Sequence, residues 1–226
     1  MKLNADFTKR AVVHGAKIPW QPSPILGVER RMLDRIGDEV ARATTIVRYA
    51  PNSQFSPHTH GGGEEFLVLE GVFQDKHGDY PVGTYVRNPP TSSHTPGSAN
   101  GCVILVKLWQ FDPGESCPER LRQRTQIAID TTQQSYRDDS TRLGVRTIPL
   151  FSDDRETVRL EHWEANTEIL LLAQEGLEIF VLQGSFKESS EVFQSYSWLR
   201  LPPLSPLLAQ AGVEGCQIWL KQLYQF

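Results

Sequence analysis

Four residues that can bind a metal ion lie at a regular spacing in the first half of this chain. His58 and His60 are separated by one residue, and Glu64 follows a run of three glycines. On an extended strand, side chains two positions apart point to the same face. The glycine-rich turn can bring Glu64 back toward the two histidines, and His94 arrives from a later strand. Three imidazoles and one carboxylate make a donor set that suits zinc, iron, nickel or manganese.

The spacing of these residues resembles the two sequence motifs of the cupin family. Glu64 fits the first motif better than Glu65 does, because the motif's glycine follows after six further residues, at Gly71. The second motif is met by Gly83, Pro89 and His94. The resemblance implies one metal ion, held by His58, His60, Glu64 and His94.

Three positions depart from the cupin pattern. Asn52 and Thr91 stand where the motifs usually have glycine, and Ser98 replaces an asparagine. None of the three holds a metal ligand, so we expect the departures to change the loops rather than the site. The alternative interpretation is that His58 and His60 are solvated loop histidines near the end of a strand. The joint fit of four ligand positions favours the metal site.

Length and composition limit the class of protein. The 226 residues allow one or two domains with a sizeable core. A net charge of −4 with 23 Lys+Arg residues gives no basic stripe, which argues against nucleic-acid binding. The sequence has no apolar run near the roughly 18 residues of a membrane span and no signal-peptide pattern, so we expect a cytoplasmic protein that binds no membrane. Three widely separated cysteines argue against a disulfide framework: Cys102, Cys117 and Cys216.

The second half of the chain repeats the first. Gly71 and Gly184 are 113 positions apart (184 − 71). The same offset separates Glu65/Glu178, Phe73/Phe186, Arg87/Arg200, Pro89/Pro202 and Pro90/Pro203. The offset drifts slowly elsewhere, which indicates one ancestral unit present twice with small insertions. The two units run roughly from residue 7 to 113 and from 122 to 226, and we place the domains at 1–118 and 119–226.

Each unit reads as all-β. Short segments rich in β-branched and aromatic residues are bounded by Gly, Pro, Asn or Asp, which is typical of strands. These segments are 43–49, 65–69, 84–87 and 103–109 in the first unit and 158–163, 168–173, 177–182 and 217–223 in the second. The pattern predicts a sandwich or jelly roll, the architecture of cupins, and therefore two tandem cupin barrels, a bicupin.

The repeat shows which residues stand in the second unit at the positions of the four candidate ligands. At the offset of 113, the four ligand positions fall on Leu171, Ala173, Leu177 and Leu207. Apolar side chains in a barrel interior need no polar partners. We therefore expect the second unit to be a degenerate barrel without metal ligands, and one metal ion per chain.

Segments 28–37, 41–51, 64–73 and 78–90 look like the ChrR-type cupins, the sensory domains of zinc-dependent anti-sigma factors. The resemblance is close over about residues 20–110. It implies zinc first, with iron, nickel or manganese as alternatives. Family members that bind sigma factors carry an N-terminal helical domain with a His-x3-Cys-x2-Cys zinc site, and the residues before the cupin region hold no such pattern. We do not expect direct sigma-factor binding by that route.

Two functions from different classes remain open. The first is a metal-binding sensor or regulatory module that detects an oxidant or small molecule at the metal. The second is a metal-dependent dioxygenase that cleaves a ketone or diketone, as some ChrR-like cupins do. Three or four protein ligands leave positions open on a five- or six-coordinate ion for oxygen or substrate. A homodimer is expected by analogy, since cupins often pair through sheet edges.

Several further residues have structural or pocket roles to be tested. Tyr49, Phe66, Tyr85, Arg87 and Trp109 lie on strands of the metal-bearing unit and either line its pocket or belong to its core. The shared position of Arg87 and Arg200 favours a structural ion pair. Cys102 and Cys216 read as small buried hydrophobes. Cys117 is expected to be exposed and His77 to be a solvated turn residue.

Overall fold

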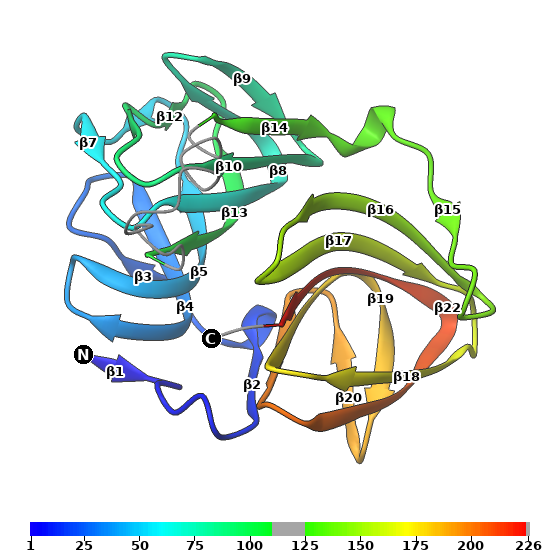
Figure 1. Cartoon of the computed structure of the whole chain (residues 1–226). Helices are drawn as coiled ribbons and strands as arrows, with labels where there is room; N and C mark the ends of the chain where they lie inside the picture. The colour runs from blue at the N-terminus through cyan, green and yellow to red at the C-terminus, as the bar shows by residue number, and fades with distance from the viewer. Residues whose placement is uncertain (110–124, 225–226) are drawn as a thin grey trace. The chain divides into compact units, whose positions relative to one another are not determined.

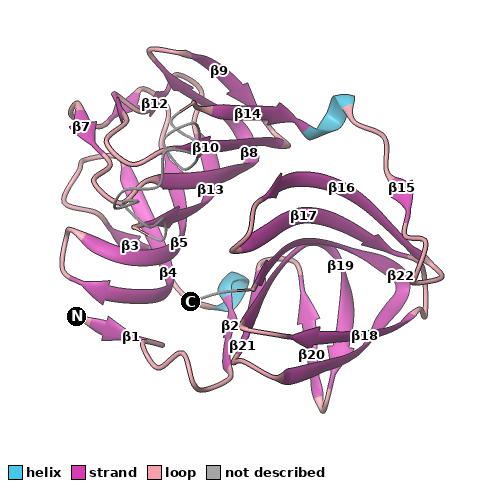
Figure 2. Ribbon diagram, viewed as in Figure 1, coloured by secondary structure: helices cyan, strands magenta, loops and turns pink. Residues whose placement is uncertain are grey.

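The computed structural model describes residues 1–109 and 125–224, and most of these residues lie in strands (Figure 1). Two short 3-10 turns, η1 (Gly15–Lys17) and η3 (Thr131–Gln133), interrupt them, and the described residues contain no α-helix (Figure 2). The all-β prediction is therefore confirmed. Within the same described ranges, no helix is long and apolar enough to cross a bilayer.

The chain divides into two compact units. The first consists of residues 1–5 and 19–133, and the second of residues 6–18 and 134–226. Each unit is built around one large antiparallel sheet.

The first sheet has the strand order β1-β4-β5-β13-β8-β10-β14. Its strands are β1 (Lys2–Leu3), β4 (Val28–Gly37), β5 (Ala41–Tyr49), β13 (Cys102–Leu108), β8 (Glu64–Asp75), β10 (Thr84–Asn88) and β14 (Ile127–Asp130). Short strands extend it: β3 (Gln21–Pro22), β6 (Ser53–Gln54), β9 (Gly78–Pro81) and β12 (Gly97–Ser98). A separate two-stranded pair is formed by β7 (His58–Thr59) and β11 (Ser93–His94).

The second sheet repeats this order as β15-β16-β17-β22-β19-β21-β2. Its strands are β15 (Arg137–Asp138), β16 (Val145–Ser152), β17 (Glu156–Trp163), β22 (Ser205–Leu223), β19 (Gly176–Glu188), β21 (Ser197–Leu201) and β2 (Ala11–His14). Two strands lie off this path: β18 (Glu168–Ala173) on β22 and β20 (Glu191–Gln194) on β19. All eight strand segments predicted from the sequence are strands here, most of them longer than predicted.

The last strand of each sheet comes from the beginning of the other repeat. Strand β14 pairs with β10 in the first unit, and β2 pairs with β21 in the second. Each of these two strands is followed by a 3-10 turn, so they hold equivalent places in the two repeats. The expected boundary at 118/119 lies outside the described residues. The two observed units are not two consecutive halves of the chain. Because of the strand exchange, residues 6–18 belong to the second unit, and the described residues up to 133 belong to the first.

The repeated glycines have a steric reason. Gly71 and Gly184 both have positive φ, of 71° and 74°. A Cβ on Gly71 would collide with the carbonyl oxygen of Gly101, and one on Gly184 would collide with that of Gly215. Glycine adopts positive φ without strain and lets two backbones approach closely. The same close contact therefore appears in both units.

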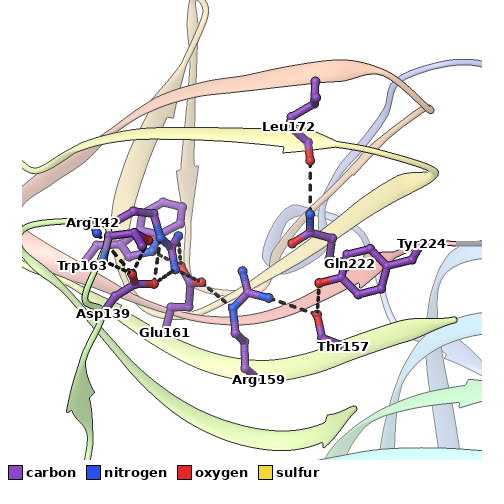
Figure 3. Close-up of polar contacts among 10 residues, drawn as sticks. Asp139, Arg142, Thr157, Arg159, Glu161, Trp163, Leu172, Gln222 and Tyr224 are labelled. Carbon is purple, nitrogen blue, oxygen red and sulfur yellow. Dashed lines mark hydrogen bonds and ion pairs between the residues drawn. The ribbon is translucent and has the colours of Figure 1, made fainter. Parts of the chain in front are cut away.

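The second unit is filled by apolar side chains and closed by a polar network. Its core holds Trp163, Phe186 and Phe193, all fully buried. At one edge, Arg142 Nη2 lies 2.6 Å from both Asp139 Oδ2 and Glu161 Oε1 (Figure 3). The Trp163 indole donates to Glu161 Oε2 at 2.6 Å. A buried carboxylate needs such partners, because an unpaired charge in a protein interior is costly.

Candidate metal centre

The short pair β7–β11 positions two of the predicted ligands. His58 and His94 are direct partners in this antiparallel pair. His60 follows β7, and its Nε2 lies 2.9 Å from His94 Nε2. The nearest ring nitrogens of the three histidines all lie within 4.8 Å of one another. His60 and His94 are buried and His58 is half-buried, so the alternative of solvated loop histidines is wrong for His60.

Glu64 is the fourth predicted residue, and its carboxylate lies beside the imidazoles. Its Oε2 is 3.5 Å from His60 Nε2 and 3.6 Å from His94 Nε2. Asn88 Nδ2 donates to the same oxygen at 3.0 Å. Glu64 begins β8, where it pairs with Asn88 on β10 and with Leu108 on β13. The structure therefore brings together all four residues singled out by spacing.

Hydrogen bonds orient two of the imidazole rings toward this cluster. His94 Nδ1 lies 2.9 Å from Asp75 Oδ2, whose side chain is fully buried. His58 Nδ1 lies 2.9 Å from the carbonyl oxygen of Ser56. An acceptor at Nδ1 fixes the proton there and leaves Nε2 with its lone pair. His94 thus directs its Nε2 toward His60 and Glu64.

The net effect of burial and neighbouring groups is to lower the pKa values of His60 and Asp75. Burial lowers the pKa of His60, and the neighbouring His94 and His58 lower it further, against an opposing effect of Glu64. Burial raises the pKa of Asp75, but hydrogen bonds and charge from His94 and His77 outweigh it, so the net pKa is lowered. A lower pKa favours neutral His60, the form that binds a metal, and ionised Asp75, the form that supports His94 as a ligand.

The donor atoms of His60, Glu64 and His94 are spaced like the ligands of one ion, and a His58 nitrogen lies within 4.8 Å of the other two imidazole nitrogens. Zinc-type ions bind imidazole nitrogen and carboxylate oxygen at about 2.0–2.2 Å. Ligand atoms of such an ion stand about 3 Å apart or slightly more, and the separations here are 2.9, 3.5 and 3.6 Å. Two imidazole lone pairs that converge at 2.9 Å repel each other unless a proton or a cation lies between them. The residues present therefore suit a bound cation.

Two glycines and two left-handed residues shape the loops around the cluster. A Cβ on Gly62 would lie 2.7 Å from Trp109 Cα, and one on Gly61 would lie 3.0 Å from the Trp109 ring. Asn52 and Thr91, which stand where the cupin motifs have glycine, have positive φ of 60° and 70°. The motif glycines therefore correspond to a backbone conformation that this chain retains with other residues.

A cavity of about 480 Å³ opens beside the histidines. Its walls include His58, His60 and Glu64 together with inward-facing residues of β5 and β13. Of the five candidate pocket residues, Tyr49 and Trp109 line it. Phe66 belongs to the core, while Tyr85 and Arg87 bond to the Glu65 carboxylate at 2.7 and 3.2 Å. Burial, followed by the charges of Glu64 and Cys102, raises the pKa of Tyr49, so its phenol stays protonated.

Sequence reasoning missed two residues of this site. Asp75 and Asn88 hold His94 and Glu64 in place, yet neither belongs to a ligand motif. Asp75 ends β8, and the pairing of Gln74 with Gly97 on β12 brings that end of the strand near His94. The general rule that ligating histidines are backed by a carboxylate predicts such a partner without saying which one.

The second unit has no counterpart of the cluster among its described residues. Leu171 and Leu207 are direct partners on β18 and β22, as His58 and His94 are on β7 and β11. Ala173, Leu177 and Leu207 are buried in the unit's core, and Leu171 packs against it. The prediction of apolar residues at the four repeated positions is confirmed.

One arginine, two cysteines and one histidine outside the cluster have the surroundings predicted for them. Arg87 forms the expected ion pair with Glu65. Cys102 and Cys216 are buried free thiols, and burial raises their pKa values to about 11 and about 12. His77 is an exposed turn residue as predicted. Cys117 lies outside the described residues.

Solved structures with the same architecture are cupins. A provisionally assigned dioxygenase from Nostoc punctiforme matches with a TM-score of 0.77 and 14% identity, covering 96% of this chain and 83% of that chain. The bacterial pirin YhhW from Escherichia coli in complex with nickel(II) matches with a TM-score of 0.66 and 13% identity, covering 96% and 100%. The oxalate decarboxylase formate complex from Lactobacillus farciminis matches at 0.64 and 10%, covering 95% and 86%. Identities this low establish the fold alone.

Two repeated jelly-roll sheets, one of them carrying a histidine cluster, define a bicupin. Within it, residues 8–112 match the model of the ChrR cupin-like domain. No curated protein sequence matches the chain.

Proposed function

We propose that this chain is a metal-dependent cupin that binds one divalent transition-metal ion and takes a small organic molecule into the cavity beside it. The ligands are His58, His60, His94 and Glu64. The observation that carries the proposal is the convergence of three imidazole nitrogens and one carboxylate oxygen at the wall of a cavity of about 480 Å³. Cavities of this size are typical of small-molecule sites.

Zinc is the first choice of metal, and iron, nickel or manganese are the alternatives. Imidazole and carboxylate ligands bind all four, so the donor set alone does not select among them. When bound, such an ion supplies a Lewis acid that polarises an oxygen of a ligand in the cavity. The chain's own contribution is to orient the imidazoles through Asp75 and Ser56 and to surround the ligand with apolar walls.

The first use of such a site is sensing. A small molecule or oxidant that reaches the metal changes the ligand cluster, and the change is passed to the rest of the protein. This is the role that resemblance to the ChrR sensory domains implies, and the family match of residues 8–112 supports it.

The second use is oxygen-dependent cleavage of a ketone or diketone. The apolar cavity favours it, because a closed structural zinc site has no need of a substrate-sized space. The likeness in fold to the provisionally assigned dioxygenase from Nostoc punctiforme supports it further.

Metal analysis tests the proposal directly. The purified protein is measured by inductively coupled plasma mass spectrometry beside His58→Ala, His94→Ala and His77→Ala. We expect close to one metal ion per chain in the wild type and in His77→Ala, and loss of the ion in the other two. Wild-type metal content in both His58→Ala and His94→Ala would falsify the assignment of the ligands.

Oxygen uptake then separates the two uses. Protein loaded anaerobically with ferrous iron is mixed with a β-diketone or a hydroxyacetophenone. Uptake that requires iron and disappears in His94→Ala makes the protein an oxygenase. Tight zinc binding without uptake of oxygen favours the sensor.

A further inference from the structure

The cavity beside the metal ligands also reaches two arginines. Arg30 and Arg35, both on β4, line it together with Glu39. In the sheet order, β5 and β13 separate β4 from β8, where Glu64 begins. Three strand spacings of about 4.8 Å separate β4 from β8, about 14 Å across the sheet. Arg35 lies in register with Glu64, and Arg30 lies further along the strands. The cavity therefore joins a metal-binding end to a guanidinium-bearing end.

The wall between these two ends is apolar. Val47, Ile104, Val106 and Leu108 face the cavity from β5 and β13. Their side chains offer no hydrogen bond to a ligand, so they select for an apolar middle part. Polar recognition is left to the two ends of the cavity.

Apart from the Tyr49 phenol, Thr45 is the exception on this wall. It lies on β5, lines the cavity and is only 3% exposed. Its Oγ1 has no hydrogen-bond partner among the described residues. A buried hydroxyl without a partner is destabilising, so natural proteins rarely leave one unsatisfied. Its position in the wall makes a cavity ligand the natural acceptor for this hydroxyl.

Arg30 has an unused donor in the same cavity. Its Nη1 lies 3.3 Å from Glu39 Oε2, a carboxylate that is mostly exposed. Its buried Nε has no partner among the described residues. Arg35 is committed differently, because its guanidinium binds the carbonyl oxygens of Asp38 and Glu39. Arg30 is therefore the arginine with a donor left for a ligand.

The charges of the cavity favour an anion. Among the described residues, the charged ones of its lining are Arg30, Arg35, Glu39 and Glu64. The two carboxylates offset the two guanidinium groups, so a divalent ion on the histidines gives this described lining a net positive charge. A guanidinium with a free donor next to a free hydroxyl is a typical carboxylate-binding arrangement.

We infer that the cavity takes an elongated organic monoanion, with a carboxylate held by Arg30 and Thr45 and an apolar body that extends toward the metal. This inference rests on the proposed function for the metal end only. The proposed carboxylate site at the arginine end is argued from the side chains of Arg30 and Thr45 and does not depend on the metal.

Calorimetric titration of the zinc-loaded protein tests the inference, with octanoate as the probe and octanamide as its neutral analogue. We expect octanoate to bind at least about tenfold more tightly than octanamide, because a hydrogen bond to a charged group is worth more than one to a neutral group. Arg30→Gln should remove that difference. Arg48→Gln is the matched control, because Arg48 lies on the same sheet outside the cavity and pairs with Glu29.

Thr45→Val separates binding from folding. Valine keeps the shape and removes the unpaired hydroxyl, so the ligand-free protein should melt at a higher temperature while octanoate binds several-fold more weakly. Equal affinities for octanoate and octanamide, or octanoate binding unchanged in Arg30→Gln, would overturn the inference. Zinc content measured on the same samples reports on the metal site independently. A wild type without metal that still prefers octanoate refutes the metal proposal and supports this one.

Discussion

His58 and His94 face each other directly across the antiparallel pair β7–β11, and Leu171 and Leu207 face each other in the same way across β18–β22. The two repeats therefore keep one backbone arrangement with two kinds of side chain. In the first unit His94 points its Nε2 at the buried Glu64 carboxylate, and in the second unit the leucine pair fills an apolar core. Among the described residues, the histidine cluster is confined to the first unit, although both units share one strand order.

Substitution by alanine should have different effects at Leu207 and at His94. Leu207 is fully buried, so Leu207→Ala should lower the free energy of unfolding by about 2–5 kcal/mol through the lost contacts and the cavity left behind. Metal content should stay at the wild-type level. Urea denaturation and metal analysis of Leu207→Ala beside His94→Ala check both points, and loss of metal in Leu207→Ala would contradict the separation of roles.

Removing the carboxylate behind His94 should weaken the metal site without abolishing it. In Asp75→Asn the side chain keeps its shape but no longer holds the His94 Nδ1 proton with a negative charge. Loss of such a partner typically costs about 10–100-fold in metal affinity. Competition with a chelator measures the affinity. Asp79→Asn is the control, since Asp79 is exposed and bonds only to Gln74 among the contacts found here. Equal affinity in both variants would argue against a positioning role for Asp75.

Thr91→Gly should stabilise the loop that precedes His94. Thr91 has φ +70°, a conformation that strains a β-branched residue by about 1–3 kcal/mol and glycine not at all. The greater freedom of unfolded glycine offsets about 0.5–1 kcal/mol of this gain. We expect the free energy of unfolding to rise by about 1 kcal/mol in urea denaturation. Asn52→Gly should raise the free energy of unfolding by less than Thr91→Gly does, because asparagine tolerates positive φ.

The second unit should lose stability in acid. Burial raises the pKa of Glu161, but hydrogen bonds and charges from Arg142, Arg159 and Trp163 outweigh it, so the pKa lies below its ordinary value of 4.5. Burial also raises the pKa of Asp139, but hydrogen bonds and charge from Thr141 and Arg142 outweigh it, so the pKa lies below its ordinary value of 3.8. A carboxylate whose pKa is lowered on folding stabilises the native state above its unfolded pKa. That stabilisation is lost as the pH falls below about 4.5 toward the folded pKa values.

Glu161→Gln tests this network. The variant leaves Arg142 and Arg159 without their buried partner, so at pH 7 it should be destabilised by about 3 kcal/mol. Its unfolding free energy should then fall less steeply than that of the wild type between pH 5 and about pH 3. Hydrogen exchange in β16 and β17 at several pH values measures both effects. A parallel fall in the two proteins would show that Glu161 does not carry the acid sensitivity.

The strand exchange predicts which fragment of the chain can fold. A fragment of residues 1–118 keeps β10 but lacks β14, its partner along four register positions. An unpaired edge strand of this kind promotes aggregation. We expect residues 1–133 to unfold cooperatively and to bind metal, and residues 1–118 to aggregate. Sedimentation and metal titration of both fragments decide the matter, and equal behaviour would mean that β14 is dispensable.

Much of the site could be predicted because its ligands are set by local spacing. His58 and His60 are two positions apart, and the glycines before Glu64 allow a tight turn, so chemistry and chain geometry act over a few residues. Asp75 could not be predicted in the same way. Its approach to His94 depends on how β8, β11 and β12 pair, and many carboxylates in the sequence would satisfy the same general rule.

The sequence by itself determined the all-β class, the repeat, the four candidate ligands and the apolar residues that replace them in the second unit. These properties depend on residue type and on periods of a few residues. Only the tertiary structure decided that β2 and β14 change places, that Asp75 and Asn88 hold the ligands, and that Arg30 and Thr45 share a cavity with them. The physical reason is that strand pairing joins residues far apart in the chain, and a side chain's partners are fixed only when the register of those strands is fixed.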